Sequence, residues 1–169
     1  MTRKLWVPAL VGLLVAALVG PTVVTAAEPR LTTKTIMVPA AAFIPTTDNS
    51  DYGNEGLALW VGSSYGNFTA PLSFPVPVVN IKKITLYALD DNAGAGICAT
   101  LYRARPADAS DDSAGQVCTT NASAPQSPYT TTISPRRVNT GLQGPYLWVN
   151  ISGPSVWLYG VKVTYSYEA

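Results

Sequence analysis

Short segments in which apolar and polar residues alternate constrain the fold of this chain more than any other feature. In residues 82–89, Ile84, Leu86 and Ala88 would share one face of a strand. The same alternation recurs in three later segments, residues 97–103, 146–151 and 160–167. Beyond residue 27, no segment longer than about ten residues has helical periodicity. The pattern therefore predicts an all-β chain.

The residues between these segments favour turns. The chain contains 13 glycines and 14 prolines, and only 12% of its residues are charged, against roughly 25% in an average protein. Such a composition suits many short strands joined by turns and does not suit long, solvated helices. We therefore expect a jelly-roll-like β-sandwich of eight or nine antiparallel strands.

The first 27 residues have the organisation of a secretory signal peptide. Arg3 and Lys4 precede an apolar run over residues 5–19, and small residues then offer cleavage after Ala26 or Ala27. The run is shorter than the roughly 20 residues of a membrane-spanning helix. We expect a secreted protein with one domain over residues 28–169 and no membrane contact after cleavage. An uncleaved anchor is the alternative.

Cys98 and Cys118 are the two cysteines of the chain. An even number of cysteines in an exported protein favours a disulfide. Residues 97–103 and 116–119 are expected to be strands joined by a polar loop at residues 106–113, so the bridge would link a hairpin. Two free thiols or a redox couple are the alternatives, although the C-x-x-C spacing of most redox couples is absent.

The charged residues exclude several kinds of chemistry. There is no histidine, which removes the commonest general base and metal ligand. Two of the 11 basic residues lie in the leader, leaving nine against ten acidic residues, so nothing indicates nucleic-acid binding. No carboxylate pair stands out for glycoside hydrolysis, because Glu28 and Glu168 lie at the ends of the domain. No G-x-S-x-G elbow is present. We therefore expect no enzyme and no catalytic metal.

Two groups of acidic and amide residues lie in expected loops: Asp90, Asp91 and Asn92, and Asp108, Asp111 and Asp112. Oxygen ligands of this kind can hold Ca²⁺, but neither group matches the twelve-residue calcium loop. Asp and Asn also favour turns because their side chains bond to the nearby backbone. Turns are the preferred interpretation, with a calcium loop as the weaker one.

Four aromatic residues are candidates for facing a ligand. Tyr146 and Trp148 alternate with Leu147 and Val149, and Trp60 is out of phase with its apolar neighbours. Tyr65 lies in the turn that follows. Outward aromatic rings can stack on a sugar or pack against another chain. The alternative for each residue is a place beneath a loop or a second sheet.

Three stretches resemble a loose group of exported bacterial proteins. They are V-P-A-A-A-F at residues 38–43, the strand and acidic turn at residues 84–92, and L-Y-G-V-K-V-T-Y at residues 158–165. The resemblance implies a secreted β-sandwich, and it assigns neither an activity nor site residues.

Three classes of function fit these features. A non-catalytic structural or interaction module is preferred, because sparse charge and many apolar residues favour surfaces that pack against something. Such a module would self-associate or dock onto an extracellular polymer. A carbohydrate-binding module that uses exposed Trp and Tyr is the second hypothesis. A small carboxylate-dependent hydrolase is the third.

Overall fold

A computed structural model describes residues 30–47, 51–63, 65–120 and 123–168. The predicted leader and its cleavage sites lie outside these residues. The described chain is almost entirely β-structure, apart from two short turns of helix, η1 (Ala40–Ala42) and η2 (Pro106–Asp108). Neither turn, nor any other helix in the described part, is long and apolar enough to cross a membrane. The prediction of an all-β chain is confirmed.

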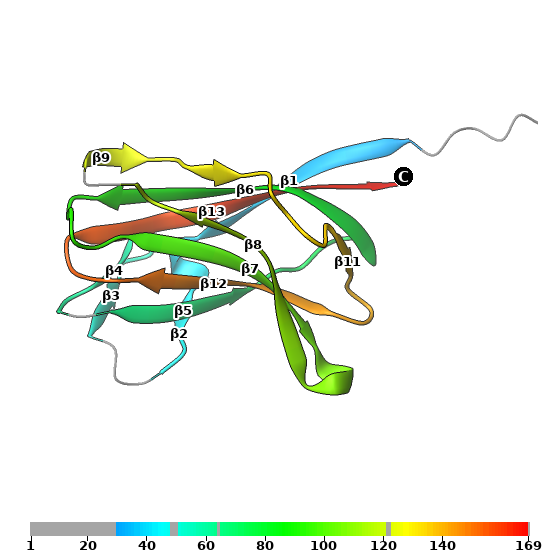
Figure 1. Cartoon of the computed structure of the whole chain (residues 1–169), viewed down its shortest axis with the longest axis horizontal. Coiled ribbons are helices and arrows are strands. Elements are labelled where there is room, and N and C mark those ends of the chain that lie inside the picture. Colours follow the sequence, from blue (N-terminus) through cyan, green and yellow to red (C-terminus); the bar gives the residue numbers. More distant parts are fainter. Residues whose placement is uncertain (1–29, 48–50, 64, 121–122, 169) are drawn as a thin grey trace, which may run out of the picture.

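Two antiparallel sheets pack face to face as a sandwich (Figure 1). The eight-stranded sheet contains β1 (Leu31–Pro39), β3 (Tyr52–Asn54), β4 (Leu59–Val61), β6 (Val78–Asp90), β9 (Ser123–Gln126), β10 (Tyr129–Thr130), β11 (Arg137–Asn139) and β13 (Val156–Glu168). The five-stranded sheet has the order β2 (Ile44–Pro45), β5 (Gly66–Pro71), β12 (Gly144–Ile151), β7 (Ile97–Arg105) and β8 (Ser110–Cys118).

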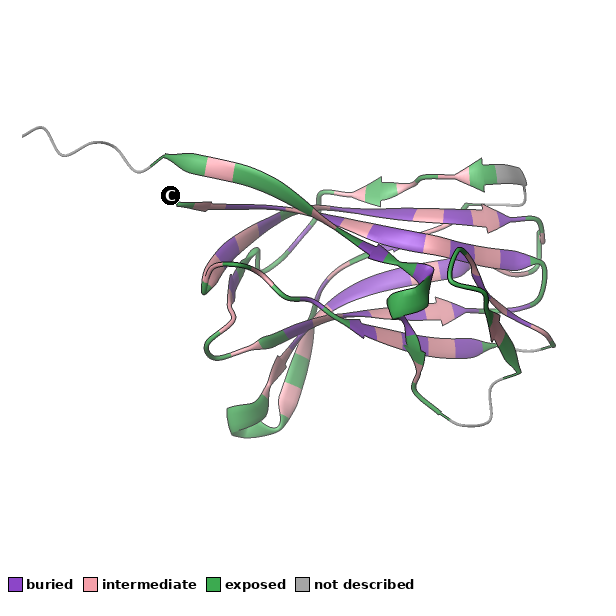
Figure 2. Ribbon diagram, turned by 180° about the vertical axis from the view of Figure 1, so that it is seen from behind, coloured by how far each residue is buried: buried purple, intermediate pink, exposed green. Residues whose placement is uncertain are grey.

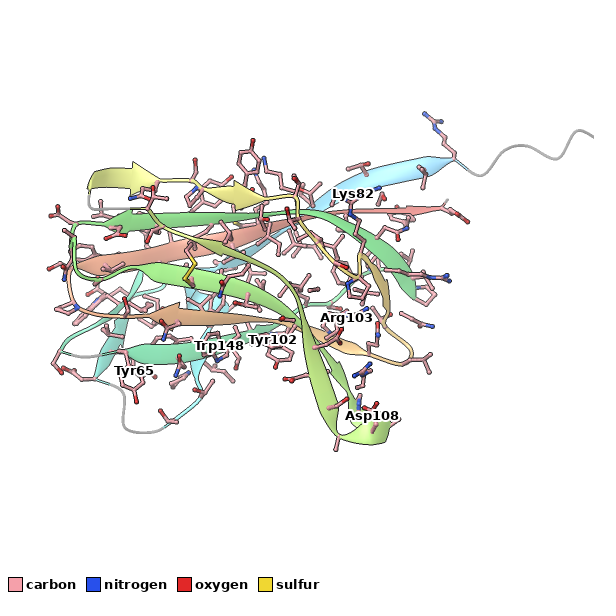
Figure 3. The ribbon with its side chains drawn as sticks, viewed as in Figure 1. Tyr65, Lys82, Tyr102, Arg103, Asp108 and Trp148 are labelled. Carbon is pink, nitrogen blue, oxygen red and sulfur yellow. A yellow bond between two sulfur atoms is a disulfide. The ribbon has the colours of Figure 1, made fainter. Side chains whose placement is uncertain are left out.

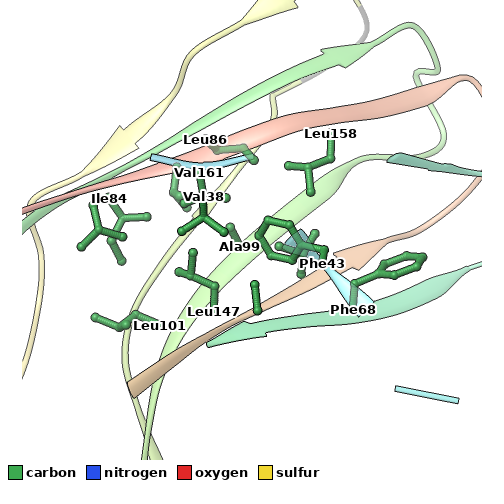
Figure 4. Packing of buried hydrophobic residues seen from close by; sticks show 14 of the residues in the cluster. Val38, Phe43, Phe68, Ile84, Leu86, Ala99, Leu101, Leu147, Leu158 and Val161 are labelled. Atoms are coloured by element: carbon green, nitrogen blue, oxygen red, sulfur yellow. The ribbon is translucent and has the colours of Figure 1, made fainter. Parts of the chain in front are cut away.

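The core lies between the two sheets and follows the alternation of the sequence (Figure 2). In β12, Leu147, Val149 and Ile151 are fully buried, whereas the residues between them are half-buried. In β6, Ile84 and Leu86 point into the same core. Figure 4 shows Ile84, Leu86 and Leu147 in this core, together with Phe43 and Phe68. Burial of one face of each sheet fixes the register of its strands, because a slip of one residue would expose that face.

The predicted number of strands was too low. The described residues form thirteen strands, against the eight or nine expected from alternation. Six of them, β2, β3, β4, β9, β10 and β11, have two to four residues. A period of two residues cannot be recognised over so short a length.

The predicted loop at residues 106–113 was also wrong in its second half. The chain turns through η2, and β8 begins at Ser110. Ser110 and Asp111 pair with Arg105 and Ala104 of β7. Their polar composition indicates a loop, but pairing with β7 overrides this local preference.

The disulfide between Cys98 and Cys118 is present, as predicted. The two residues are direct cross-strand partners on β7 and β8, with their Cα atoms 4.0 Å apart. Cys98 also lies opposite Asn150 of β12. Because the neighbouring residues Ile97 and Ala99 are buried in the core, the bridge lies on the outer face of the five-stranded sheet.

Candidate functional site

Three aromatic side chains gather on the outer face of the five-stranded sheet. Tyr146 and Trp148 project from β12, and Tyr102 projects from β7, all between residues that are buried in the core. Each of the three is half-buried. We call Tyr102, Tyr146 and Trp148 the aromatic face, and Figure 3 shows Tyr102 beside Trp148 on this side of the sandwich.

Tyr102 contacts both of the other rings. Tyr102 and Tyr146 are direct cross-strand partners, and their rings stack with centroids 5.3 Å apart and an interplanar angle of 12°. The ring of Trp148 meets Tyr102 edge to face, with centroids 6.5 Å apart. Both arrangements suit the quadrupoles of aromatic rings. The strand register therefore gives the rings fixed orientations.

Polar side chains border the rings on the same face. Asn150 lies two residues beyond Trp148 and donates through Nδ2 to Oδ1 of Asn67, 2.9 Å away on β5. On the other side, Gln116 of β8 donates to the hydroxyl of Thr100 at 3.0 Å. A primary amide has two donor hydrogens and two acceptor lone pairs, so each amide keeps hydrogen-bonding capacity beyond these contacts.

The hairpin between β7 and β8 borders the aromatic face at one end. Its tip, which carries η2, extends beyond β12 and away from the sandwich (Figure 1). A pocket of about 350 Å³ lies between this hairpin and the sheet, lined by Ala104, Arg105, Pro106, Ala109, Ser110, Asp111 and Tyr146. The aromatic face is therefore continuous with a recess that contains charged and hydroxyl groups.

Asp111 fixes the position of Tyr146 in this recess. The phenolic hydroxyl of Tyr146 donates a hydrogen bond of 2.5 Å to Oδ2 of Asp111. Burial of the phenol and this hydrogen bond to a carboxylate together raise the pKa of Tyr146 well above its ordinary value. Tyr146 thus remains a neutral donor, and its ring cannot turn away without breaking the bond.

Two further contacts hold the hairpin. Arg105 donates through Nε to the hydroxyl of Ser110 at 3.2 Å, and that hydroxyl donates to Asp108 at 2.6 Å. The hydrogen bond from Ser110 lowers the pKa of Asp108.

Deeper in the fold, the buried guanidinium of Arg103 pairs with Asp112. Arg103 also donates to the backbone carbonyl of Arg137 at 3.0 Å, which links the two sheets.

The structure brings together only two of the four aromatic residues singled out from the sequence, Tyr146 and Trp148. Trp60 lies on β4, in the other sheet. Tyr65 precedes β5 and is 65% exposed; it lies at the opposite end of the five-stranded sheet from Asp108 (Figure 3). Tyr102 was missed, although its alternation with Leu101 indicates an outward side chain.

Most of the residues considered for calcium have other partners in the structure. Asp90 is buried and accepts from the backbone N–H of Asn92, and Asn92 in turn accepts from Gly94 in a side-chain-to-backbone turn. Asp91 follows Asp90 directly at the end of β6. Asp108, Asp111 and Asp112 make the contacts with Ser110, Tyr146 and Arg103 given above. In the described parts of the chain, no three His, Cys, Asp or Glu side chains converge as a metal site would require.

Comparison with known proteins supports the fold. No family model and no curated protein sequence matches the chain. The CBM22-1–GH10 modules of xylanase 10B from Clostridium thermocellum, solved with xylohexaose, are similar at a TM-score of 0.51 and 9% identity, over 82% of this chain and 28% of that one. The chain thus spans little more than a quarter of that protein.

Two further solved structures are similar over most of both chains. The xylan-binding module CBM15 has a TM-score of 0.49 and 11% identity, covering 82% of this chain and 100% of that one. The low-affinity xylan-binding module CBM86 from Roseburia intestinalis has a TM-score of 0.45 and 13% identity, covering 78% and 94%. At 9% identity and a TM-score above 0.5, the similarity to the xylanase modules shows a shared fold alone.

Proposed function

We propose that this domain is a non-catalytic module that binds an extracellular polysaccharide on its aromatic face. One observation carries the proposal: Tyr102, Tyr146 and Trp148 form a contiguous group of half-exposed rings on the outer face of the sheet, with amide groups beside them. Sugar rings have apolar C–H faces and polar hydroxyl edges. An aromatic ring can pack against the first, and amides can hydrogen-bond to the second.

The fixed positions of the rings favour binding. The bond from Tyr146 to Asp111 and the stacking of Tyr146 on Tyr102 order both phenols before a ligand arrives. A preorganised site loses less conformational entropy on binding than a mobile one. The recess beside the β7–β8 hairpin adds Arg105 and Ser110 at one end of the face, where a further sugar unit of a chain could form hydrogen bonds.

Carbohydrate binding is preferred to self-association through an apolar face, the first expectation from the sequence. Apart from Leu31 and Met37, which share β1, the exposed large aliphatic residues lie on separate segments: Ile44 on β2, Leu57 between β3 and β4, and Leu142 between β11 and β12. The aromatic face itself carries amide groups beside the rings, which could hydrogen-bond to the hydroxyl edges of a sugar. Asp111, the carboxylate nearest the rings, is held by Tyr146, which favours a binding role over hydrolysis.

The proposal is tested with the mature chain and insoluble xylan, cellulose and chitin in a pull-down, followed by titration with soluble oligosaccharides. We expect retention on at least one glycan, and at least about tenfold weaker binding for Trp148→Ala, as for a central contact residue. Trp157→Ala, on the opposite sheet, is the matched control and should bind as the parent chain does. Binding that survives Trp148→Ala unchanged would contradict the proposal, as would no retention on any glycan.

A further inference from the structure

A second pair of aromatic residues lies on the outer face of the other sheet. Trp60 of β4 and Trp157 of β13 are direct cross-strand partners. Their neighbours Leu59, Val156 and Leu158 are fully buried, so both indoles point away from the core. Directly opposed residues have Cβ atoms about 5 Å apart, close enough for the two rings to form a single site.

The two indoles do not stack on each other. Among the described residues, the ring contacts include no Trp60–Trp157 pair. Instead, the indole of Trp60 lies across Gly53 of β3: a Cβ atom added to Gly53 would lie 2.4 Å from Cε2 of Trp60. Gly53 is the cross-strand partner of Trp60 on the side away from β13. The absence of a side chain there lets Trp60 lean away from Trp157.

Both tryptophans line a pocket of about 350 Å³, together with Glu55, Ala58, Val61 and Ser155. Its lining is apolar except for Ser155 and the carboxylate of Glu55. The backbone N–H of Glu55 donates to the carbonyl of Ala58 at 3.1 Å, which closes the turn that carries this carboxylate. Glu55 makes no ion pair within the described chain, and no basic side chain lines the pocket.

Two lysine side chains lie over aromatic rings on the eight-stranded sheet. Nζ of Lys83 lies 3.7 Å from the ring centroid of Tyr129, and Nζ of Lys162 lies 5.3 Å from that of Tyr87. No lysine or arginine of the described residues lies over Trp60 or Trp157, although indole is the aromatic group that attracts cations most strongly. The two indoles and the unpaired carboxylate therefore form a negative pocket with no cation from the chain.

We infer that the pocket lined by Trp60 and Trp157 binds a small organic cation, an alkylated ammonium group such as that of choline. The methyl groups of such an ion would contact the indoles and the apolar lining, and its charge would be balanced by the ring faces and by Glu55. A neutral sugar fits less well, because its hydroxyl groups need several hydrogen-bond partners and the lining offers few. The inference does not depend on the proposed carbohydrate function.

Titration of the ¹⁵N-labelled mature chain with choline chloride tests the inference through the indole N–H signals. We expect choline to shift the signals of Trp60 and Trp157 and to leave that of Trp148 in place. Its neutral isostere, in which carbon replaces the nitrogen, should bind at least about tenfold more weakly. Glu55→Gln should weaken choline binding about threefold, as for loss of one exposed charge, and Trp157→Leu at least about tenfold.

Trp148→Ala is the matched control and should leave choline binding unchanged. Equal affinity for choline and its isostere would overturn the inference, because the pocket would then respond to shape and not to charge. Unchanged choline binding in Glu55→Gln, or the absence of any shift at Trp60 and Trp157, would also overturn it. So would a soluble oligosaccharide that shifts these two signals where choline does not, since it would identify a second sugar site.

Discussion

The two outer faces of the sandwich share one sequence pattern but differ in how their aromatic rings are arranged. On both sheets, aromatic residues alternate with buried aliphatic ones. On the five-stranded sheet, Tyr146 lies opposite another aromatic residue, Tyr102, and the rings stack. On the eight-stranded sheet, Trp60 lies between Trp157 and Gly53 and leans over the glycine. The cross-strand partner of an outward aromatic residue thus determines the arrangement: Tyr102 gives a closed cluster of rings, and Gly53 allows an open pocket.

Removing the disulfide should have the largest effect on stability. It should also distinguish the two outer faces, because the bridge lies only on the face of the five-stranded sheet. Replacing both Cys98 and Cys118 by alanine frees a loop of 20 residues, and the chain-entropy relation gives a loss of about 3 kcal/mol in the free energy of unfolding. Urea denaturation measures this loss directly. The indole signals of Trp60 and Trp157 should keep their positions, and a loss below about 1 kcal/mol would contradict the expectation.

Removing the central ring of the aromatic face should have the next largest effect. Tyr102 contacts both Tyr146 and Trp148, and each aromatic pair contributes about 0.5–1.5 kcal/mol beyond its buried area. We expect Tyr102→Ala to lower the free energy of unfolding by about 2 kcal/mol and to weaken glycan retention as well. Urea denaturation and the pull-down measure the two effects.

Tyr129→Ala is the control for Tyr102→Ala. Tyr129 is 61% exposed and contacts Lys83, and its removal should cost less than about 1 kcal/mol without changing glycan retention. An equal loss in the free energy of unfolding for both variants would contradict the expectation that a ring in a cluster contributes more to stability than an isolated exposed ring.

Much of the framework could be predicted from the sequence, because local alternation and global burial agree. The core faces of the strands around Ile84, Leu101 and Leu147 follow directly from a period of two residues. The hairpin disulfide follows from two cysteines on neighbouring expected strands. These features depend on residues close together in the chain, where sequence patterns are informative.

The assembly of the candidate sites could not be predicted in the same way. Alternation indicates that Tyr102 points outward, but its contact with Tyr146 depends on pairing between strands more than 40 positions apart in the chain. Likewise, Trp60 was grouped with Trp148, whereas pairing with β13 places it in the other sheet. A local pattern shows which face of a strand is buried, but it does not show which strands pair or which sheet each strand joins.

A side chain at Gly53 should close the open pocket. A Cβ atom there would meet the indole of Trp60 at 2.4 Å, so Gly53→Ala should push the ring towards Trp157. We expect a loss of about 1 kcal/mol in the free energy of unfolding, as for mild overpacking, and about threefold weaker choline binding. Gly144→Ala is the control, because its nearest neighbour, Ala104, would lie 3.9 Å away in ordinary contact. Equal choline binding by both variants would show that Gly53 does not determine the ring position.

The smallest effect is expected at the edge of the aromatic face and should depend on pH. Tyr146→Phe removes the hydrogen bond to Asp111, and because Asp111 is exposed we expect a loss of about 0.5 kcal/mol at neutral pH. Burial and the neighbouring carboxylate raise the pKa of Tyr146 in the folded chain above the ordinary value of 10.0.

As the pH rises above that ordinary value, the unfolded chain therefore loses this proton while the folded chain keeps it, and the free energy of unfolding decreases. Tyr146→Phe should thus show a shallower decrease in melting temperature between about pH 9 and about pH 11 than the parent chain. Tyr165, whose pKa is also raised by burial, is present in both proteins, so its contribution cancels in the comparison. Parallel curves for the parent and Tyr146→Phe would mean that neither burial nor Asp111 raises the pKa of this phenol in the folded chain.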